Sequence, residues 1–115
     1  MKILIFGTGD YYNRYKKWFN PEDIIAFIDN SEYKQNTLID NKPVLSVKEG
    51  LKLSYDAIII LSFYVKSMKS QLIECGVDEK KIYHFYDLYK IFSIKDDKKE
   101  IKVYGNIRKD NLSQR

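Results

Sequence analysis

The chain has one cysteine and no long run of apolar residues among its 115 residues. Because Cys75 has no second cysteine to pair with, an internal disulfide is excluded. The longest apolar stretch, residues 57–61, is far shorter than the roughly 20 residues that cross a bilayer, so no membrane helix is expected. The apolar residues 3–6 are too few for the core of a signal peptide. We therefore expect a cytoplasmic protein.

Histidine also occurs only once, and this scarcity limits the chemistry that can be predicted. No cysteine or carboxylate pattern completes a metal site or a nucleophilic triad around His84, so no metal ligand and no catalytic residue is assigned. Two Tyr-x-x-x-Lys pairs, Tyr12 with Lys16 and Tyr86 with Lys90, match the catalytic spacing of short-chain dehydrogenases. In a chain with ten tyrosines and many lysines such pairs arise by chance, so they receive little weight.

The net charge of +4 does not indicate a nucleic-acid partner, because it is unevenly distributed. Residues 93–115 carry seven basic and four acidic side chains, and they account for most of the excess. A segment of mixed sign is typical of a solvated tail rather than of a nucleic-acid surface. We expect no nucleic-acid partner.

Hydrophobic residues make up 44% of the chain, enough for a core, and they fall into short runs separated by helical patterns. Runs that are apolar at nearly every position are typical of strands buried on both faces of a parallel sheet. Apolar residues three and four positions apart predict the helices between them. The expected strands are residues 2–6, 24–28, 43–45, 57–62 and 81–85, and the expected helices are residues 10–19, 46–53, 65–75 and a closing helix through Leu88, Ile91 and Phe92.

Several local signals refine these elements. Ser46 followed by Glu49 is a capping-box pattern, which predicts a helix start. Gly76 is expected to take a left-handed conformation at the end of a helix, with Cys75 before it packed in the core. Residues 31–42 are polar and without a clear period, so a long loop is expected there.

The alternation of strands and helices predicts one α/β domain over residues 1–92. Its expected architecture is a Rossmann-like, doubly wound parallel sheet of about five strands in the order 3-2-1-4-5. Residues 93–115 are expected to be a polar tail or an added edge strand through Ile101 and Val103. Ligands of such sheets bind at the carboxyl ends of the strands, beside the point where the strand order reverses.

The segments expected at this switch point supply the candidate binding residues. They are Gly7, Thr8, Gly9, Asp10, Tyr11, Tyr12, Asp29, Asn30, Ser62 and Phe63. A glycine turn between a strand and a helix favours a phosphate, because it exposes backbone amides. A purely structural turn is the alternative: Tyr12 replaces the third glycine of the G-x-G-x-x-G pattern, and Asp10 adds a negative charge.

Asp29 lies 22 residues after Gly7, close to the roughly 20 expected for the acid that binds a ribose hydroxyl. The alternative is that Asp29 caps a turn with Asn30 and Ser31. The aromatic side chains of residues 11–19 recur at helical spacing and are interpreted as core, with a nucleobase platform or a subunit contact as the alternatives.

Together these segments resemble the Rossmann-like module that accompanies glycosyltransferases, sugar acetyltransferases and nucleotide-sugar dehydratases in bacterial surface-polysaccharide biosynthesis. The resemblance covers residues 2–92 and rests on ILIFGTG (3–9), AFIDN (26–30), KPVL (42–45), DAIIILS (56–62) and QLIECGV (71–77). It implies phosphate contact at Gly7, Thr8 and Gly9, and nucleoside contact at Asp29 and Asn30. The ligand itself stays open, because modules of this kind bind a UDP-sugar, NAD or nothing known.

The first functional hypothesis is a non-catalytic nucleotide or nucleotide-sugar binding module for cell-surface glycan synthesis. Such a module would act alone or within a larger assembly, either as a homodimer or in association with, or fused to, a glycosyltransferase. The second is a domain of an NAD-dependent sugar-nucleotide epimerase or dehydratase, against which the incomplete glycine motif and the lack of an acid-base pair count. The third is an interaction domain without a ligand, which self-associates through the aromatic face of its first helix.

Overall fold

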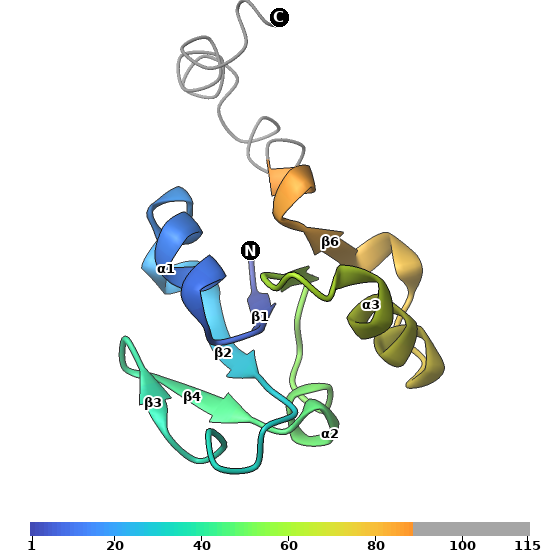
Figure 1. Ribbon diagram of the computed structural model, residues 1–115, viewed down its shortest axis with the longest axis horizontal. Coiled ribbons are helices and arrows are strands. Elements are labelled where there is room, and N and C mark those ends of the chain that lie inside the picture. Colours follow the sequence, from blue (N-terminus) through green and yellow to red (C-terminus); the bar gives the residue numbers. More distant parts are fainter. Residues whose placement is uncertain (89–115) are drawn as a thin grey trace, which may run out of the picture. The chain divides into compact units, whose positions relative to one another are not determined.

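A computed structural model describes residues 1–88 of the chain (Figure 1). Its centre is one six-stranded sheet in the order β3-β4-β2-β1-β5-β6. All pairings are parallel except that of β3 with β4, which is antiparallel. The strands are β1 (Ile3–Phe6), β2 (Ile24–Ile28), β3 (Leu38–Ile39), β4 (Lys42–Leu45), β5 (Ala57–Ile60) and β6 (Ile82–His84). The predicted α/β class with a mostly parallel sheet is confirmed.

The strand order differs from the predicted 3-2-1-4-5 because a sixth strand forms where a loop was expected. This strand, β3, lies within residues 31–42 and forms a hairpin with β4 at the edge of the sheet. Asp40 and Asn41 connect the two strands with φ angles of 48° and 68°. Positive φ at both central residues matches the right-handed twist of a hairpin. The prediction of one long loop here was wrong.

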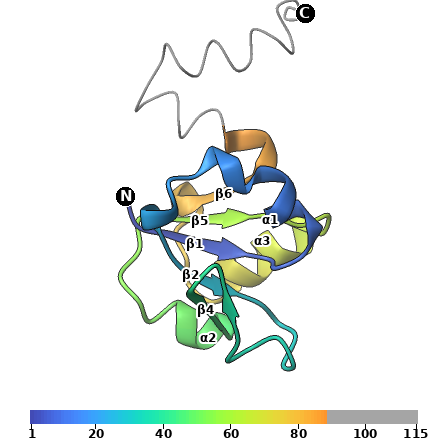
Figure 2. The ribbon, with the colours of Figure 1, turned by 90° about the vertical axis from the view of Figure 1, so that its left-hand side faces the viewer.

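The three central strands are apolar throughout because both of their faces are covered. Every residue of β1 and β5 is buried. β1 lies between β2 and β5, with Ile5 aligned on Phe27 on one side and on Ile59 on the other (Figure 2). Strands in this position need no polar alternation, which explains the uninterrupted apolar runs in the sequence.

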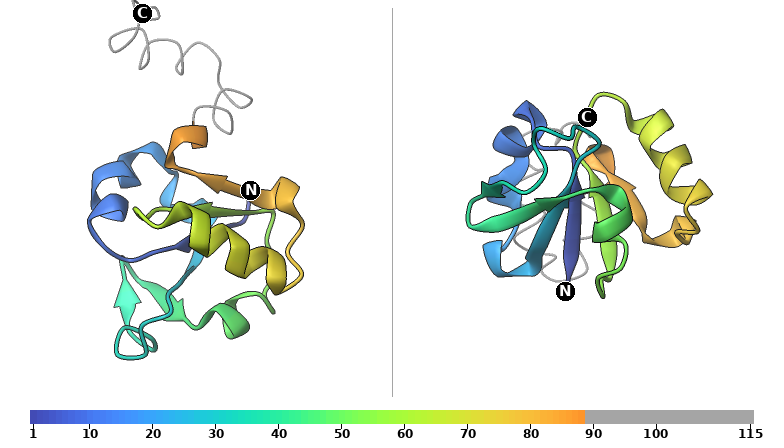
Figure 3. Two further views of the ribbon diagram at one scale, coloured as in Figure 1. Left: turned by 45° about the vertical axis from the view of Figure 1, so that its right-hand side comes forward. Right: turned by 90° about the horizontal axis from the view of Figure 1, so that it is seen from below.

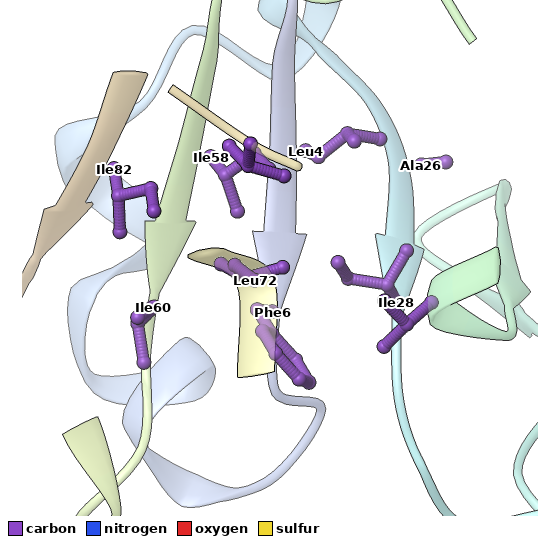
Figure 4. Close-up of a cluster of buried hydrophobic side chains, with 10 residues drawn as sticks. Leu4, Phe6, Ala26, Ile28, Ile58, Ile60, Leu72 and Ile82 are labelled. Carbon is purple, nitrogen blue, oxygen red and sulfur yellow. The ribbon is translucent and has the colours of Figure 1, made fainter. Parts of the chain in front are cut away.

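Helices cover both faces of the sheet (Figure 3). They are α1 (Asp10–Tyr15), α2 (Val47–Gly50) and α3 (Val65–Glu74). On one face, buried side chains of β1, β2 and β5 pack with residues of α2 and α3 (Figure 4). The labelled members of this cluster are Leu4, Phe6, Ala26, Ile28, Ile58, Ile60, Leu72 and Ile82. On the opposite face, Tyr12 of α1 packs against Phe27 of β2.

The first helical segment is shorter than the predicted residues 10–19. α1 ends at Tyr15, and one 3-10 turn over Lys16–Trp18 follows. A second 3-10 turn, Pro21–Asp23, begins after Asn20, whose side chain accepts a hydrogen bond from the Glu22 amide at 3.1 Å. Proline at the first position of a turn fixes a favourable φ, so the chain leaves the helix and enters β2 directly.

The end of α3 confirms the expected left-handed glycine and corrects the expectation for Cys75. Gly76 has a φ of 92°, and the amides of Gly76 and Val77 donate to Ile73 and Leu72 at 2.9 and 3.0 Å. This is the Schellman arrangement, which brings the residue after the glycine back onto the helix. Val77 therefore joins Leu72 in the core, and Cys75 is exposed.

Residues 1–85 form one compact unit, and a second unit begins at Tyr86. β6 lies between two 3-10 turns, Glu79–Lys81 and Phe85–Asp87. The closing helix through Ile91 and Phe92, the domain boundary after residue 92 and the edge strand near residues 101–103 all lie outside the described residues. Within residues 1–88, no helix has the length and apolar character needed to cross a membrane.

Candidate ligand-binding site

The parallel strands β2, β1 and β5 end at the same edge of the sheet, and each is followed by a loop with candidate binding residues. Residues 7–9 follow β1, residues 29–30 follow β2, and residues 62–64 follow β5. After β1 the chain adds β2 and β4 on one side and then returns to add β5 and β6 on the other, so the strand order reverses beside β1. The carboxyl edge beside β1 is therefore the switch point of the sheet.

Gly7 is required by the fold itself. Its φ is 117°, and a Cβ at this position would lie 2.4 Å from the carbonyl oxygen of Leu61. The Gly7 amide donates to the carbonyl of Ile28 at 3.1 Å, so it is not available to a ligand. Gly7 thus lets β1 turn between β2 and β5 without a steric clash.

Gly9 differs from Gly7 in every one of these respects. It is exposed, its φ is −99°, and a Cβ built there would meet no atom within 4 Å. The backbone amides of Thr8 and Gly9 make no hydrogen bond with the part of the chain that the structure describes. The turn therefore presents two free donors and a position without a side chain to solvent.

Asp29 connects the turn after β1 with the loop after β2. Its Oδ2 accepts a hydrogen bond from the Thr8 hydroxyl at 2.6 Å, and its Oδ1 accepts one from the Ser31 amide at 2.8 Å. The second contact closes the turn that the sequence offered as the alternative role of Asp29. Each carboxylate oxygen keeps a further lone pair, so the turn role does not prevent a contact with a ligand hydroxyl.

Tyr12 lies between α1 and the sheet and not over the glycine turn. It is only 4% exposed, and its ring meets Phe27 edge to face at 4.7 Å. Its hydroxyl donates to Asp40 at 2.7 Å, and the Lys16 amine lies 3.5 Å from the same carboxylate. The Tyr12 and Lys16 pair is thus part of a structural contact with the hairpin.

The ionisation of this contact follows from its geometry. Burial, reinforced by the hydrogen bond to Asp40, raises the pKa of the Tyr12 phenol well above its usual value. The hydrogen bond from Tyr12, and to a lesser extent the nearby Lys16, lowers the pKa of the Asp40 carboxyl. The phenol is therefore held neutral and the carboxyl is held ionised at neutral pH.

The remaining predicted residues differ in their surroundings. Asp10 is exposed in the first turn of α1. Tyr11 packs beside Tyr15 and Phe85, with ring centroids 6.4 and 5.0 Å away. These aromatic side chains are only partly buried, in contrast to Tyr12 on the same helix.

The loop after β5 presents two aromatic rings to solvent. Phe63 and Tyr64 are 76% and 68% exposed, and their rings meet edge to face at 5.5 Å. The Ser62 hydroxyl accepts a hydrogen bond from the Tyr64 amide at 3.1 Å, which holds the loop. Two exposed rings at the carboxyl edge offer a surface on which a flat group can stack.

A pocket of about 550 Å³ also opens at this edge, between the loop after β2 and the helices α2 and α3. Asn30 and Gln71 form its polar rim, because the two side-chain amides exchange a pair of hydrogen bonds, both 2.9 Å long. Lys48 of α2 and Cys75 at the end of α3 also line it. Within residues 1–88, no group of three or more His, Cys, Asp or Glu side chains is arranged to hold a metal ion.

Residues 1–83 match the family described as C2185-like, N-terminal. The chain belongs to this family. No curated protein matches the chain.

In this C2185-like N-terminal domain, the sequence predicted the glycine turn and Asp29 at the carboxyl edge of the sheet, but it did not predict the pocket. The turn residues and Asp29 are brought together as expected, through the hydrogen bond from Thr8. Tyr12 is turned away from the site, and the pocket side of the edge was not anticipated. The sequence does hold a signal for Gln71 as a pocket residue: it precedes the buried Leu72 and so lies beside the packed side of α3.

Proposed function

We propose that this domain is a non-catalytic binding module for a nucleotide or nucleotide-sugar. On this proposal the sheet is a Rossmann-like, doubly wound one, and the domain acts in the cytoplasm in bacterial cell-surface glycan synthesis. The phosphates would lie on the turn of Gly7, Thr8 and Gly9, and the nucleoside near Asp29 and Asn30.

Gly9 is the observation that carries the proposal. Glycine stabilises a fold where φ is positive or where a side chain would clash, and neither condition applies to Gly9. The position is exposed and lies beside two amides without a partner in the described part of the chain. A missing side chain at this place favours close approach of a ligand to the backbone, as phosphate-binding turns require.

The surroundings of the turn support a nucleotide over a bare phosphate. Asp29 lies at the end of the neighbouring strand, where an acidic side chain can accept a ribose hydroxyl. Phe63 and Tyr64, on the other side of β1, offer exposed rings to a base. The exposed Asp10 opposes phosphate binding, so we expect moderate affinity.

Tyr12 favours a mononucleotide or a UDP-sugar over NAD. In dinucleotide-binding turns the third glycine allows close packing of helix and strand beside the pyrophosphate. Here a buried tyrosine ring occupies that contact and keeps α1 at the distance of a full aromatic side chain. The NAD-dependent epimerase or dehydratase role is accordingly the weaker alternative.

Calorimetric titration with UDP-glucose, UMP and NAD tests the proposal, using wild type and Gly9→Ala. We expect wild type to bind UDP-glucose or UMP and not to bind NAD at millimolar concentration. Gly9→Ala should weaken binding about tenfold or more while leaving the thermal midpoint unchanged, because its Cβ meets no protein atom. Equal affinity in both proteins would remove the turn from the site, and tight NAD binding by wild type would favour the oxidoreductase role.

Three further variants complete the test. Gly7→Ala should lower the thermal midpoint, because its Cβ would overlap the carbonyl of Leu61. Asp29→Asn removes the charge of the side chain and keeps an oxygen that can accept from the Ser31 amide. Asp56→Asn is its control, because it makes the same change in charge just before β5, at the opposite edge of the sheet. Weaker binding by the first and unchanged binding by the second would assign the carboxylate of Asp29 to the ligand.

A further inference from the structure

The pocket between α2 and α3 has a hydrogen-bonding rim that remains only half used. A side-chain amide carries two N–H donors and a carbonyl oxygen with two lone pairs. In the reciprocal pair, Asn30 and Gln71 each use one donor and one lone pair on the other. One N–H and one lone pair of each amide thus remain for a ligand, and groups that both donate and accept, such as sugar hydroxyls, match them.

Two more polar groups extend this rim. The Ser46 hydroxyl accepts a hydrogen bond from the Glu49 amide at 3.1 Å, which leaves its own O–H as a donor. Gln35 donates to the carbonyl of Asp29 at 2.9 Å, and its side-chain oxygen stays available. The loop after β2 and the start of α2 therefore both present polar groups to the pocket.

The charge of the pocket favours an anion. Among residues 1–88, Lys48 is the only charged residue that lines it. The neighbouring Glu49 carboxylate is 3.3 Å from the amine of Lys52, and Lys48 forms no ion pair within residues 1–88. A lysine amine without an acidic partner attracts a phosphate or a carboxylate.

The remaining wall of the pocket distinguishes a sugar from a nucleobase. Val47 and Leu51 form an apolar side, on which the C–H groups of a pyranose ring can rest. None of the lining residues in the described part of the chain is aromatic, whereas Phe63 and Tyr64 offer rings on which a base can stack.

We propose that this pocket binds the glycosyl phosphate portion of a nucleotide-sugar, with the sugar hydroxyls on the Asn30 and Gln71 pair and Lys48 on the phosphate that carries the sugar. The inference rests on the proposed function and refines it: the glycine turn holds the phosphate next to the nucleoside, and the pocket holds the sugar with the phosphate that carries it. Asp29 then remains with the nucleoside, whereas Asn30 contacts the sugar.

Cys75 provides a direct reporter, because it is exposed, lines the pocket and is the single cysteine of the chain. Its alkylation by iodoacetamide, in which the thiolate displaces iodide, can be followed by mass spectrometry of the full chain. Glucose 1-phosphate, N-acetylglucosamine 1-phosphate and UDP-glucose are the probes, and UMP is the comparison without a glycosyl group. We expect the three probes to slow alkylation several-fold at millimolar concentration and UMP to leave it unchanged.

Matched variants separate occupancy of the pocket from an indirect effect. Lys48→Gln removes the lining charge, whereas Lys52→Gln makes the same change on a lysine that pairs with Glu49 outside the pocket. The first variant should need about tenfold more sugar phosphate for the same protection, and the second should behave as wild type. Equal behaviour of the two variants would overturn the assignment of Lys48 and the pocket.

The outcomes distinguish this inference from the proposed function. Calorimetric binding of UDP-glucose that leaves Cys75 unprotected overturns the pocket assignment and leaves the binding module standing. Protection by the sugar phosphates without binding of any nucleotide supports the pocket and overturns the nucleotide part of the proposed function. Protection by UMP as strong as that by glucose 1-phosphate, or no protection by any probe, overturns the inference.

Discussion

Single residues decide how the glycine turn should be interpreted. Gly7 and Gly9 are two positions apart in one motif, yet the first has a positive φ and a carbonyl that its Cβ would overlap, and the second has neither. The G-x-G pattern treats the two glycines alike, because a sequence pattern does not give the φ angle of a residue or the atoms near its Cα. The contrast separates a structural glycine from a candidate ligand contact.

Tyr12 should contribute more to stability through its ring than through its hydroxyl. Tyr12→Ala removes a buried aromatic side chain and should cost about 3–5 kcal/mol of the free energy of unfolding. Tyr12→Phe keeps the ring on Phe27 and loses only the hydrogen bond to the exposed Asp40, so it should cost much less. Urea unfolding of the three proteins at neutral pH measures both differences.

The pH dependence of the same variants checks the mechanism. Because the pKa of Tyr12 is raised in the folded protein, its contribution to stability is complete below the unfolded value of about 10 and is lost as the pH rises above it. Wild type should therefore lose stability more steeply above pH 10 than Tyr12→Phe does. Identical alkaline slopes for the two proteins would contradict the buried, hydrogen-bonded phenol.

At the scale of elements, the sequence predicts the strands and helix ends that have local signals, and it misses the features that form only when distant segments pair. β2 matches residues 24–28, and Gly76 takes the expected positive φ, since an apolar run and a helix end have local causes. β3 was missed because two residues show no periodicity, and only its partner β4 makes it a strand. The pocket was missed for the same reason: Asn30 and Gln71 are 41 residues apart, and no spacing rule connects them.

The turn between β3 and β4 can be tested by changing Asn41. With a φ of 68°, Asn41 lies in the left-handed region, where alanine is disfavoured by about 1 kcal/mol and glycine is not. We expect Asn41→Ala to lower the thermal midpoint and Asn41→Gly to keep or raise it. The opposite ranking of the two variants would show that this hairpin does not form as described.

At the scale of the whole molecule, the sheet order explains why residues distant in sequence reach one edge. The chain adds β2 and β4 on one side of β1, then returns to add β5 and β6 on the other. The loops after β2 and β5 are therefore placed on either side of the glycine turn. This much was predictable from alternating strands and helices, whereas membership of the C2185-like N-terminal family rests on the match over residues 1–83.

We expect the fold to need no residue after Phe92. The buried residues of β1, β2 and β5 and of α3 all lie within the unit of residues 1–85, and the sequence after residue 92 has no sustained apolar period. A chain ending at Phe92 should therefore unfold cooperatively, with a thermal midpoint close to that of the full chain, when followed by circular dichroism. A chain ending at Glu79 is the control: it lacks β6 and the buried Ile82, and should be strongly destabilised. Loss of the cooperative transition in the first truncation would mean that residues 93–115 complete the fold, as an edge strand through Ile101 and Val103 would.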